Sequence, residues 1–188
     1  IIDPNAGELA SGLEGKGRMA EPDEIVLFLD ELFGRKESLK GKKVLINAGP
    51  TREAIDPVRF ISNHSTGKMG YAVAAEFAAR GAQVTLVSGP VNILLNNPGI
   101  KVENVTTAEE MYNKTLEIYE EGADITILSA AVADFAPVLA HKTKIKREKE
   151  NYNLELKPTK DISAEIGKHK KKGSLVVGFA LETNNEVS

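Results

Sequence analysis

Short apolar runs that alternate with longer amphipathic stretches constrain the fold of this chain more than any other feature. Four runs are rich in Val, Ile and Leu, at residues 43–48 (KVLINA), 83–88 (QVTLVS), 124–131 (DITILSAA) and 175–180 (LVVGFA), and a weaker one lies at 101–105. Their length and composition are typical of strands that a parallel sheet buries on both faces. The stretches between them predict helices over residues 66–81, from about 107, and over 162–172 after an Asp161 cap. We therefore predict an α/β, Rossmann-like fold with a mainly parallel sheet flanked by helices.

The remaining segments predict smaller features. Residues 144–147 and 154–156 alternate polar and apolar side chains, which predicts a small antiparallel hairpin outside the main sheet. Residues 1–19 are Gly-rich and are predicted to be a loop. Residues 22–34 begin with Pro and end with Gly, as a helix does. A long polar loop without strands is predicted over residues 49–65, and loops of that length are usually functional.

Composition excludes several classes of protein. The 188 residues contain no Cys, so disulfides and cysteine nucleophiles are excluded. Lys and Arg number 24 against 27 Asp and Glu, which gives a formal charge of −3 and no basic excess for nucleic acid. No apolar run approaches the roughly 18 residues of a membrane span. We expect a cytoplasmic protein with neither nucleic-acid nor membrane partners, and a first residue other than Met predicts a fragment or a processed chain.

A candidate phosphate loop, Ser65 to Gly70 (STGKMG), leads into the predicted helix at 66–81. Free backbone N–H groups at such a helix start can bind phosphate. The segment is not a Walker A loop, because Met69 follows Lys68, and it lacks the first Gly of the dinucleotide motif. The alternative is that Gly67 and Gly70 serve only close packing of helix on sheet. The second strand ends in Ser-Gly-Pro without an acidic residue, which disfavours NAD and leaves an NADP-dependent reductase as an alternative.

Several motifs in one order resemble a known family. They lie at residues 48–53 (AGPTRE), 56–70 (DPVRFISNHSTGKMG), 130–135 (AAVADF), 144–147 (KIKR) and 176–183 (VVGFALET). From about residue 41 to 183 the chain resembles phosphopantothenate–cysteine ligase (phosphopantothenoylcysteine synthetase), the synthetase half of the bifunctional coenzyme A biosynthesis protein.

The resemblance implies two parts. Residues 1–38 are similar to the end of the fused flavin-dependent decarboxylase domain plus a linker, and residues 39–188 to the ligase domain. Ser11 stands where many relatives carry a catalytic Cys, so FMN and decarboxylation are not expected on this chain. Relatives continue past the last strand with further lysines, and we expect the ligase domain here to be C-terminally incomplete.

The activity implied by the resemblance is CTP-dependent ligation of 4′-phosphopantothenate to L-cysteine through an acyl-cytidylate. Mg²⁺ is expected, held mainly through substrate phosphates, and the family implies a homodimer. A non-catalytic nucleotide-binding module is a second alternative to the enzyme, beside the reductase.

Site residues follow from the same resemblance. Asn63 and Arg59 are expected in the cysteine step, Lys144 in forming the acyl-cytidylate, and Ala131 facing the intermediate. Asp134 is expected to read the cytosine or its sugar. The other predicted binding positions are Gly49, Ser65, Thr66, Gly67, Lys68, Met69, Gly70, Leu128, Ser129, Ala130, Lys157, Pro158, Thr159 and Phe179.

Structural alternatives accompany these roles. Asn63 can simply order its loop, and Arg59 can form a surface ion pair of little worth. Lys144 can lie on a solvated edge strand. Phe179 can be an ordinary core aromatic residue, and Asp134 a turn residue.

Overall fold

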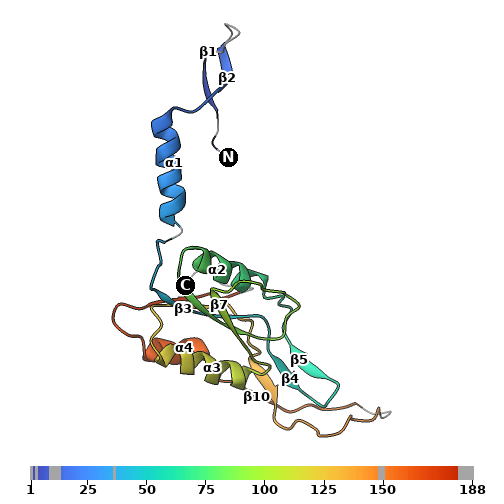
Figure 1. Ribbon diagram of the computed structural model, residues 1–188. Helices are drawn as coiled ribbons and strands as arrows, with labels where there is room; N and C mark the ends of the chain where they lie inside the picture. Colours follow the sequence, from blue (N-terminus) through green and yellow to red (C-terminus); the bar gives the residue numbers. More distant parts are fainter. Residues whose placement is uncertain (1, 3, 9–13, 36, 148–150, 182–188) are drawn as a thin grey trace.

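Figure 1 shows the computed structural model, which describes every residue except 1, 3, 9–13, 36, 148–150 and 182–188. Ser11 and the last seven residues therefore lie outside the described residues. The elements in chain order are β1 (Asn5–Glu8), β2 (Glu14–Arg18), α1 (Pro22–Arg35), β3 (Lys43–Ala48), β4 (Arg52–Ala54), β5 (Phe60–Ser62), α2 (Lys68–Ala79), β6 (Gln83–Ser88), β7 (Ile100–Asn104), α3 (Ala108–Glu120), β8 (Ile125–Leu128), β9 (Phe135–Pro137), β10 (Leu156–Pro158), α4 (Ile162–Lys168) and β11 (Leu175–Gly178).

A five-stranded parallel sheet forms the centre of the molecule. Its strand order is β11-β8-β3-β6-β7, and each neighbouring pair is parallel. Within this sheet the chain enters at the central strand β3, continues outward through β6 to β7, and then returns to form β8 on the other side of β3. The predicted α/β fold is therefore confirmed. The direction in which successive strands are added reverses between β3 and β8, and open parallel sheets usually bind ligands at such a point.

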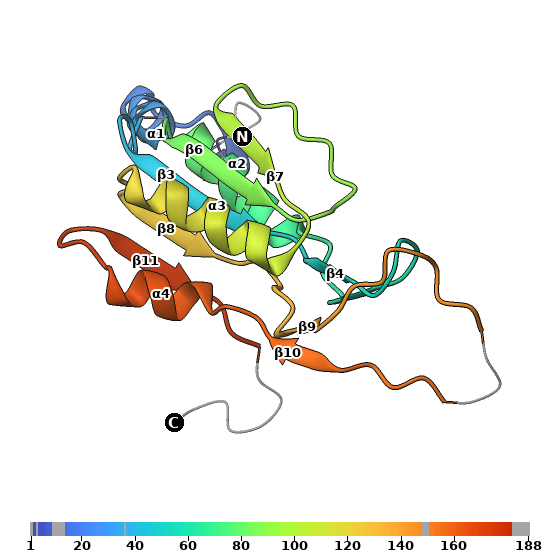
Figure 2. The same ribbon diagram turned by 90° about the horizontal axis from the view of Figure 1, so that it is seen from below.

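Helices cover both faces of this sheet, α2 on one and α3 with α4 on the other (Figures 1 and 2). Strand β3 shows why both faces are apolar. Val44 and Ile46 pack into the cluster that contains α2 residues, whereas Leu45 packs with residues of α3 and α4. All three side chains are buried. Burying one such side chain contributes about 1.5–3 kcal/mol, so the central strand anchors both layers.

Capping residues fix where two of the helices begin. Thr107 caps α3, accepting a hydrogen bond from the Glu110 N–H, while the Glu110 side chain accepts from the Thr107 N–H. Asp161 caps α4 through the Ala164 N–H at 2.9 Å, as predicted, although the helix ends at Lys168 rather than at 172. The reciprocal bonds at α3 and the single bond at α4 satisfy backbone donors that a helix start otherwise leaves open.

Three predictions about the smaller segments were wrong. Residues 1–19 are not all loop, because β1 and β2 pair antiparallel there. The long loop after β3 contains the β4–β5 hairpin. The hairpin expected from residues 144–147 and 154–156 instead pairs β9 with β10, and residues 144–147 form no strand. The alternative that Lys144 lies on a solvated edge strand therefore does not apply.

Strands β1 and β2 and helix α1 form an arm that projects from the rest of the molecule (Figure 1). Helix α1 exposes several apolar side chains, among them Val26 and Leu27. Within the described residues, every helix is too short or too polar to cross a membrane.

Candidate functional site

A cavity of about 1160 Å³ opens at the carboxyl ends of β3, β8 and β11, beside the reversal between β3 and β8. It is lined by Asn47, Asn63, His64, Met69, Leu128, Ser129, Ala130, Ala131, Val132, Asp134, Thr159, Lys160, Asp161, Ile162, Ser163, Gly178, Phe179, Ala180 and Leu181. Pockets for ligands of a few hundred daltons have volumes of about 300–1,000 Å³. The cavity is thus large enough for a nucleotide, and it gathers the polar loops that follow three separate strands.

Asn47 holds one wall of this cavity in place. Its side chain is buried, with 2% of the residue exposed, and its Oδ1 accepts from the N–H groups of Ser129 (2.8 Å) and Ala130 (3.0 Å). The Ser129 hydroxyl also donates to the Asn47 carbonyl at 2.6 Å. The Ala131 N–H donates to Gly49. These three backbone donors are therefore used within the protein and are not available to a ligand.

Sequence reasoning missed Asn47 because it stands inside an apolar run. The signal was present, since an uncharged polar residue near the carboxyl end of a buried strand points to a bound loop or ligand.

Asn63 lies at the end of the β4–β5 hairpin and clamps the facing loop. Its Nδ2 donates to the carbonyls of Ala131 (3.2 Å) and Val132 (3.0 Å). This is the loop-ordering role. The amide keeps its oxygen as an acceptor, and the residue lines the cavity.

Three other predicted residues line the larger cavity, and Asp134 and Thr159 are joined by their backbones. The backbone carbonyl of Asp134 accepts from the Thr159 N–H at 2.9 Å, and the Thr159 hydroxyl donates to the Ala133 carbonyl at 2.6 Å. The Asp134 carboxylate is on an exposed residue of the cavity lining. Phe179 is 56% exposed and its N–H donates to the Leu128 carbonyl, so it borders the cavity and is not a core aromatic residue.

A second, smaller cavity of about 480 Å³ adjoins the first, and the two share Asn63 and His64. The candidate phosphate loop contributes Ser65, Thr66 and Lys68 to it. Arg52 also lines this cavity, with its guanidinium 4.8 Å from the centroid of the Phe60 ring. The smaller cavity is therefore the more basic of the two.

Backbone conformation and packing explain why two positions of the candidate loop are glycine. Gly67 has φ of 75° at the start of α2, a conformation that favours glycine, and the helix has no side-chain cap or acidic residue in its first turn. A Cβ on Gly70 would lie 2.5 Å from the Ala48 Cβ and 2.7 Å from the Ser129 Oγ. Gly70 thus allows α2 to pack closely on β3, the packing role that the sequence left open.

Seven predicted residues line neither cavity. Gly49, Gly67 and Gly70 are buried, while Lys157 and Pro158 are exposed on β10. Lys144 is exposed in the segment after β9. Arg59 also lines neither cavity, and its Nε donates to the Asp56 carboxylate at 2.9 Å.

The acidic residue Asp161, at the edge of the larger cavity, is committed to its helix. The Ser163 hydroxyl and the Ala164 N–H hold the pKa of the Asp161 carboxyl below its ordinary value. Among the described residues, no three His, Asp or Glu side chains are grouped as a metal site.

Known relatives of the chain agree on one family. The family described as the DNA/pantothenate metabolism flavoprotein C-terminal domain matches residues 39–188. The coenzyme A biosynthesis bifunctional proteins CoaBC of Haemophilus influenzae and Bacillus subtilis are each 47% identical, over 185 and 187 residues, covering 98% of this chain and 46% of each relative. A protein of an unknown prokaryotic organism, named cysteine/cysteine sulfinic acid decarboxylase, is 54% identical over 192 residues, covering 100% of this chain and 53% of that protein.

A crystal structure of the C-terminal domain of CoaBC superposes with a TM-score of 0.68 at 42% identity, covering 79% of this chain and 69% of that one. The chain spans about half the length of the curated relatives it matches. The resemblance seen in the sequence motifs is thereby confirmed: the chain belongs to the DNA/pantothenate metabolism flavoprotein C-terminal domain family, that of the C-terminal domain of CoaBC.

Proposed function

We propose that this chain is a phosphopantothenate–cysteine ligase that uses CTP to join 4′-phosphopantothenate to L-cysteine in coenzyme A biosynthesis. The observation that carries the proposal is the pair of adjoining cavities, one large enough for a nucleotide and one basic, in a member of this family. Family membership also removes the support for an NADP-dependent reductase.

The reaction needs an activated acyl group, because a carboxylate carbon is a poor electrophile at neutral pH. The carboxylate oxygen of phosphopantothenate attacks the α-phosphorus of CTP and pyrophosphate leaves, giving an acyl-cytidylate. The amine of cysteine then attacks the acyl carbon, CMP leaves, and the amine loses a proton. Both steps bring anionic groups together, so cationic side chains stabilise their transition states.

The larger cavity is suited to the nucleotide. The Asp134 carboxylate can accept a hydrogen bond from the exocyclic amine of cytosine, a donor that uracil lacks. Phe179 lines the same cavity and offers a half-exposed ring for stacking. The N–H groups of Ser129, Ala130 and Ala131 already donate within the protein. We therefore propose that the nucleotide contacts the carbonyls and side chains of this loop.

The smaller cavity is suited to the phosphate of phosphopantothenate. Lys68 and Arg52 line it, and the uncapped start of α2 presents the positive end of the helix. Asn63 lies between the two cavities, where the acyl carbon would be placed. Because its N–H donors are taken, we propose that its Oδ1 accepts from the attacking amine and orients it.

Magnesium is proposed to enter with the nucleotide, neutralising phosphate charge as it often does when substrate phosphates supply most of the ligands. The homodimer, the cytoplasmic location, the division of the chain at residue 38 and FMN binding by a fused half stay predictions.

Pyrophosphate release tests the proposal without requiring cysteine. We expect release when the chain is mixed with CTP, Mg²⁺ and 4′-phosphopantothenate, and little with UTP in place of CTP. The variant Asp134→Asn offers an amide in place of the carboxylate and should lower discrimination between CTP and UTP. No release by the wild-type chain, with CTP binding still seen by calorimetry, would favour the non-catalytic nucleotide-binding module.

A further inference from the structure

The segment that carries Lys144 is fastened to the β4–β5 hairpin. We call residues 141–147 the strap. At one end of it, the His141 N–H donates to the Ile55 carbonyl at 2.9 Å. Near the other end, Ile145 donates its N–H to an Asp56 carboxylate oxygen at 3.1 Å. Lys144 lies between these two attachments, so its backbone is held on both sides.

Asp56 is the centre of the second attachment. Its side chain is fully buried and accepts from the backbone N–H groups of Val58 (2.8 Å) and Arg59 (2.9 Å), besides that of Ile145. It also accepts two bonds from the Arg59 guanidinium. This guanidinium holds the pKa of the Asp56 carboxyl well below its usual range, with the backbone donors adding to the effect. The carboxylate is therefore ionised whenever the protein is folded near neutral pH.

Arg59 closes the arrangement from the other side. The same Nη2 that contacts Asp56 donates to the Ile145 carbonyl at 2.8 Å. Ile145 is thus held by both its N–H and its carbonyl. We call this set of contacts among Asp56, Arg59 and Ile145 the clasp. These bonds use three of the five N–H donors of the guanidinium, that of Nε and the two of Nη2, and Arg59 lines neither cavity.

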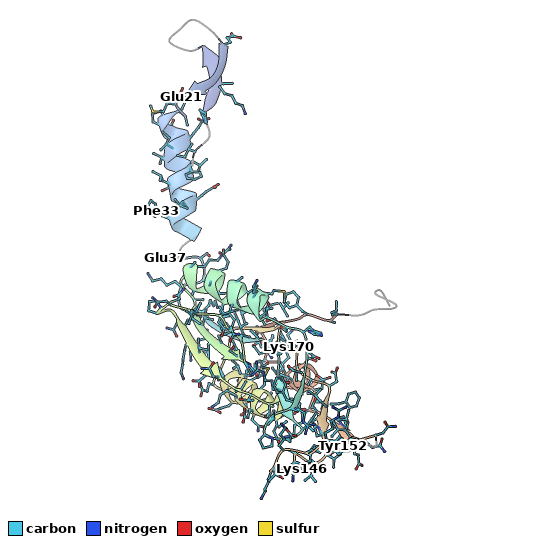
Figure 3. All side chains as sticks on the ribbon, turned by 90° about the vertical axis from the view of Figure 1, so that its right-hand side faces the viewer. Glu21, Phe33, Glu37, Lys146, Tyr152 and Lys170 are labelled. Carbon is cyan, nitrogen blue, oxygen red and sulfur yellow. The ribbon has the colours of Figure 1, made fainter. Side chains whose placement is uncertain are left out.

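The two parts joined by the clasp both lead to the proposed site. The hairpin ends at Asn63, which lines both cavities, and the strap follows β9, which begins directly after Asp134. The strap is strongly basic, with exposed side chains at Lys142, Lys144, Lys146 and Arg147. Figure 3 shows Lys146 and Tyr152 at the end of the molecule opposite α1, and the Tyr152 hydroxyl lies 3.0 Å from His141 Nε2.

We propose that Asp56 and Arg59 are positioning residues: the clasp sets where the basic strap, and Lys144 within it, stands relative to the cavities that take the anionic substrates. Arg59 then acts on the reaction through the strap and not by touching substrate. This inference rests on the proposed ligase function for its effect on rate, whereas the clasp itself can be tested separately.

The first test is limited trypsin digestion of the full chain, with cleavage sites mapped by mass spectrometry. Trypsin cuts after Lys and Arg, so faster cleavage within the strap shows that the strap has detached from the hairpin. We expect Asp56→Asn and Arg59→Met to increase cleavage after residues 142–147 by about tenfold or more, with Arg59→Lys between them and wild type. Asp124→Asn is the matched control. Asp124 also accepts from a backbone N–H and a lysine, but at the amino ends of β3 and β8, away from the strap. Unchanged strap cleavage in Asp56→Asn would overturn the clasp.

The second test is pyrophosphate release with CTP and 4′-phosphopantothenate. A misplacement of about 1 Å can cost about a hundredfold in rate, so Asp56→Asn should lower kcat by tenfold or more with a smaller change in KM. In a Lys144→Ala background the same substitution should have little further effect on kcat. A full, additive loss in that background would overturn positioning through Lys144. Normal kcat with a released strap would show that the clasp has no part in the reaction. If the wild-type chain releases no pyrophosphate, the ligase proposal fails, and digestion still decides whether the clasp exists.

Discussion

Replacing Gly70 by Ala should destabilise the protein, although the same change stabilises a helix where the added methyl group meets no neighbour. In a helix interior, Ala is favoured over Gly by about 1 kcal/mol. Here the added Cβ would lie 2.5 Å from the Ala48 Cβ, whereas carbon atoms pack best at about 3.5–4.0 Å. The two carbons must separate by about 1 Å or more. Ala48 is fully buried in the central strand and has no rotatable side chain, so helix α2 has to move.

The cost follows from these contacts. Overpacking a core by one methyl group costs about 1–3 kcal/mol. The new methyl group also lies 2.7 Å from the Ser129 Oγ, which donates to the Asn47 carbonyl, and losing that bond costs about 1 kcal/mol. After subtracting the helix propensity, we expect Gly70→Ala to lower the free energy of unfolding by about 1–3 kcal/mol.

Urea unfolding followed by far-ultraviolet circular dichroism measures this effect. Gly167→Ala is the matched control, because Gly167 lies in α4 with nothing within 4 Å of the added Cβ, and it should raise the free energy of unfolding by up to about 1 kcal/mol. Adding Ala48→Gly to Gly70→Ala removes the opposing methyl group and should recover part of the loss. A Gly70→Ala variant as stable as wild type would refute the close packing of α2 on β3.

Three further outcomes are expected from unfolding measurements. Asn47→Leu leaves the N–H groups of Ser129 and Ala130 without their acceptor and should lower the free energy of unfolding by about 2–4 kcal/mol. Asn47→Asp keeps an acceptor and should stay nearer to wild type. Equal losses in the two variants would contradict the role of Asn47 in holding the loop. The buried hydroxyl of Thr126 has no hydrogen-bond partner among the described residues, so Thr126→Val should raise stability by about 1 kcal/mol in urea, and a loss would contradict this. Because the pKa of Asp161 is lowered in the folded state, its carboxylate stabilises the fold above the ordinary pKa of 3.8, and that contribution is lost as pH falls through the folded pKa. Asp161→Asn keeps a capping side chain without the charge, so its stability should fall less than that of wild type in acid titrations, and parallel curves would refute the linkage.

The central strands β3, β6 and β8 could be predicted most clearly from the sequence, because both faces of each are covered. Burial on two sides demands a continuous apolar run, and β3 with its buried residues from Val44 onward is the clearest case. The short hairpins could not be predicted in this way. Strands β4, β5, β9 and β10 have three residues each, and their side chains are largely exposed. Their pairing depends on backbone partners set by the rest of the fold.

The candidate site shows the same division. The loops after β3, β8 and β11 could be placed together in advance, since the carboxyl ends of parallel strands share one edge. Which atoms remain free for a ligand could not. Asn63 donates to the Ala131 and Val132 carbonyls, and Arg59 donates from Nε and Nη2 to Asp56 and Ile145. Apart from the Asp56–Arg59 pair, these contacts join residues far apart in the sequence, so no local pattern predicts them.

The strand order also governs when the site can exist during synthesis on the ribosome. Strands β3, β6, β7 and β8 are complete once Leu128 has emerged, and they are neighbours in the sheet. The last wall of the larger cavity, from Gly178 to Leu181, follows only after another crossover. Until β11 arrives, β8 is the edge of the nascent sheet, and its short length limits pairing with other chains. A ligand that needs every wall of the larger cavity would therefore stabilise, by mass action, only the finished domain and not the growing chain.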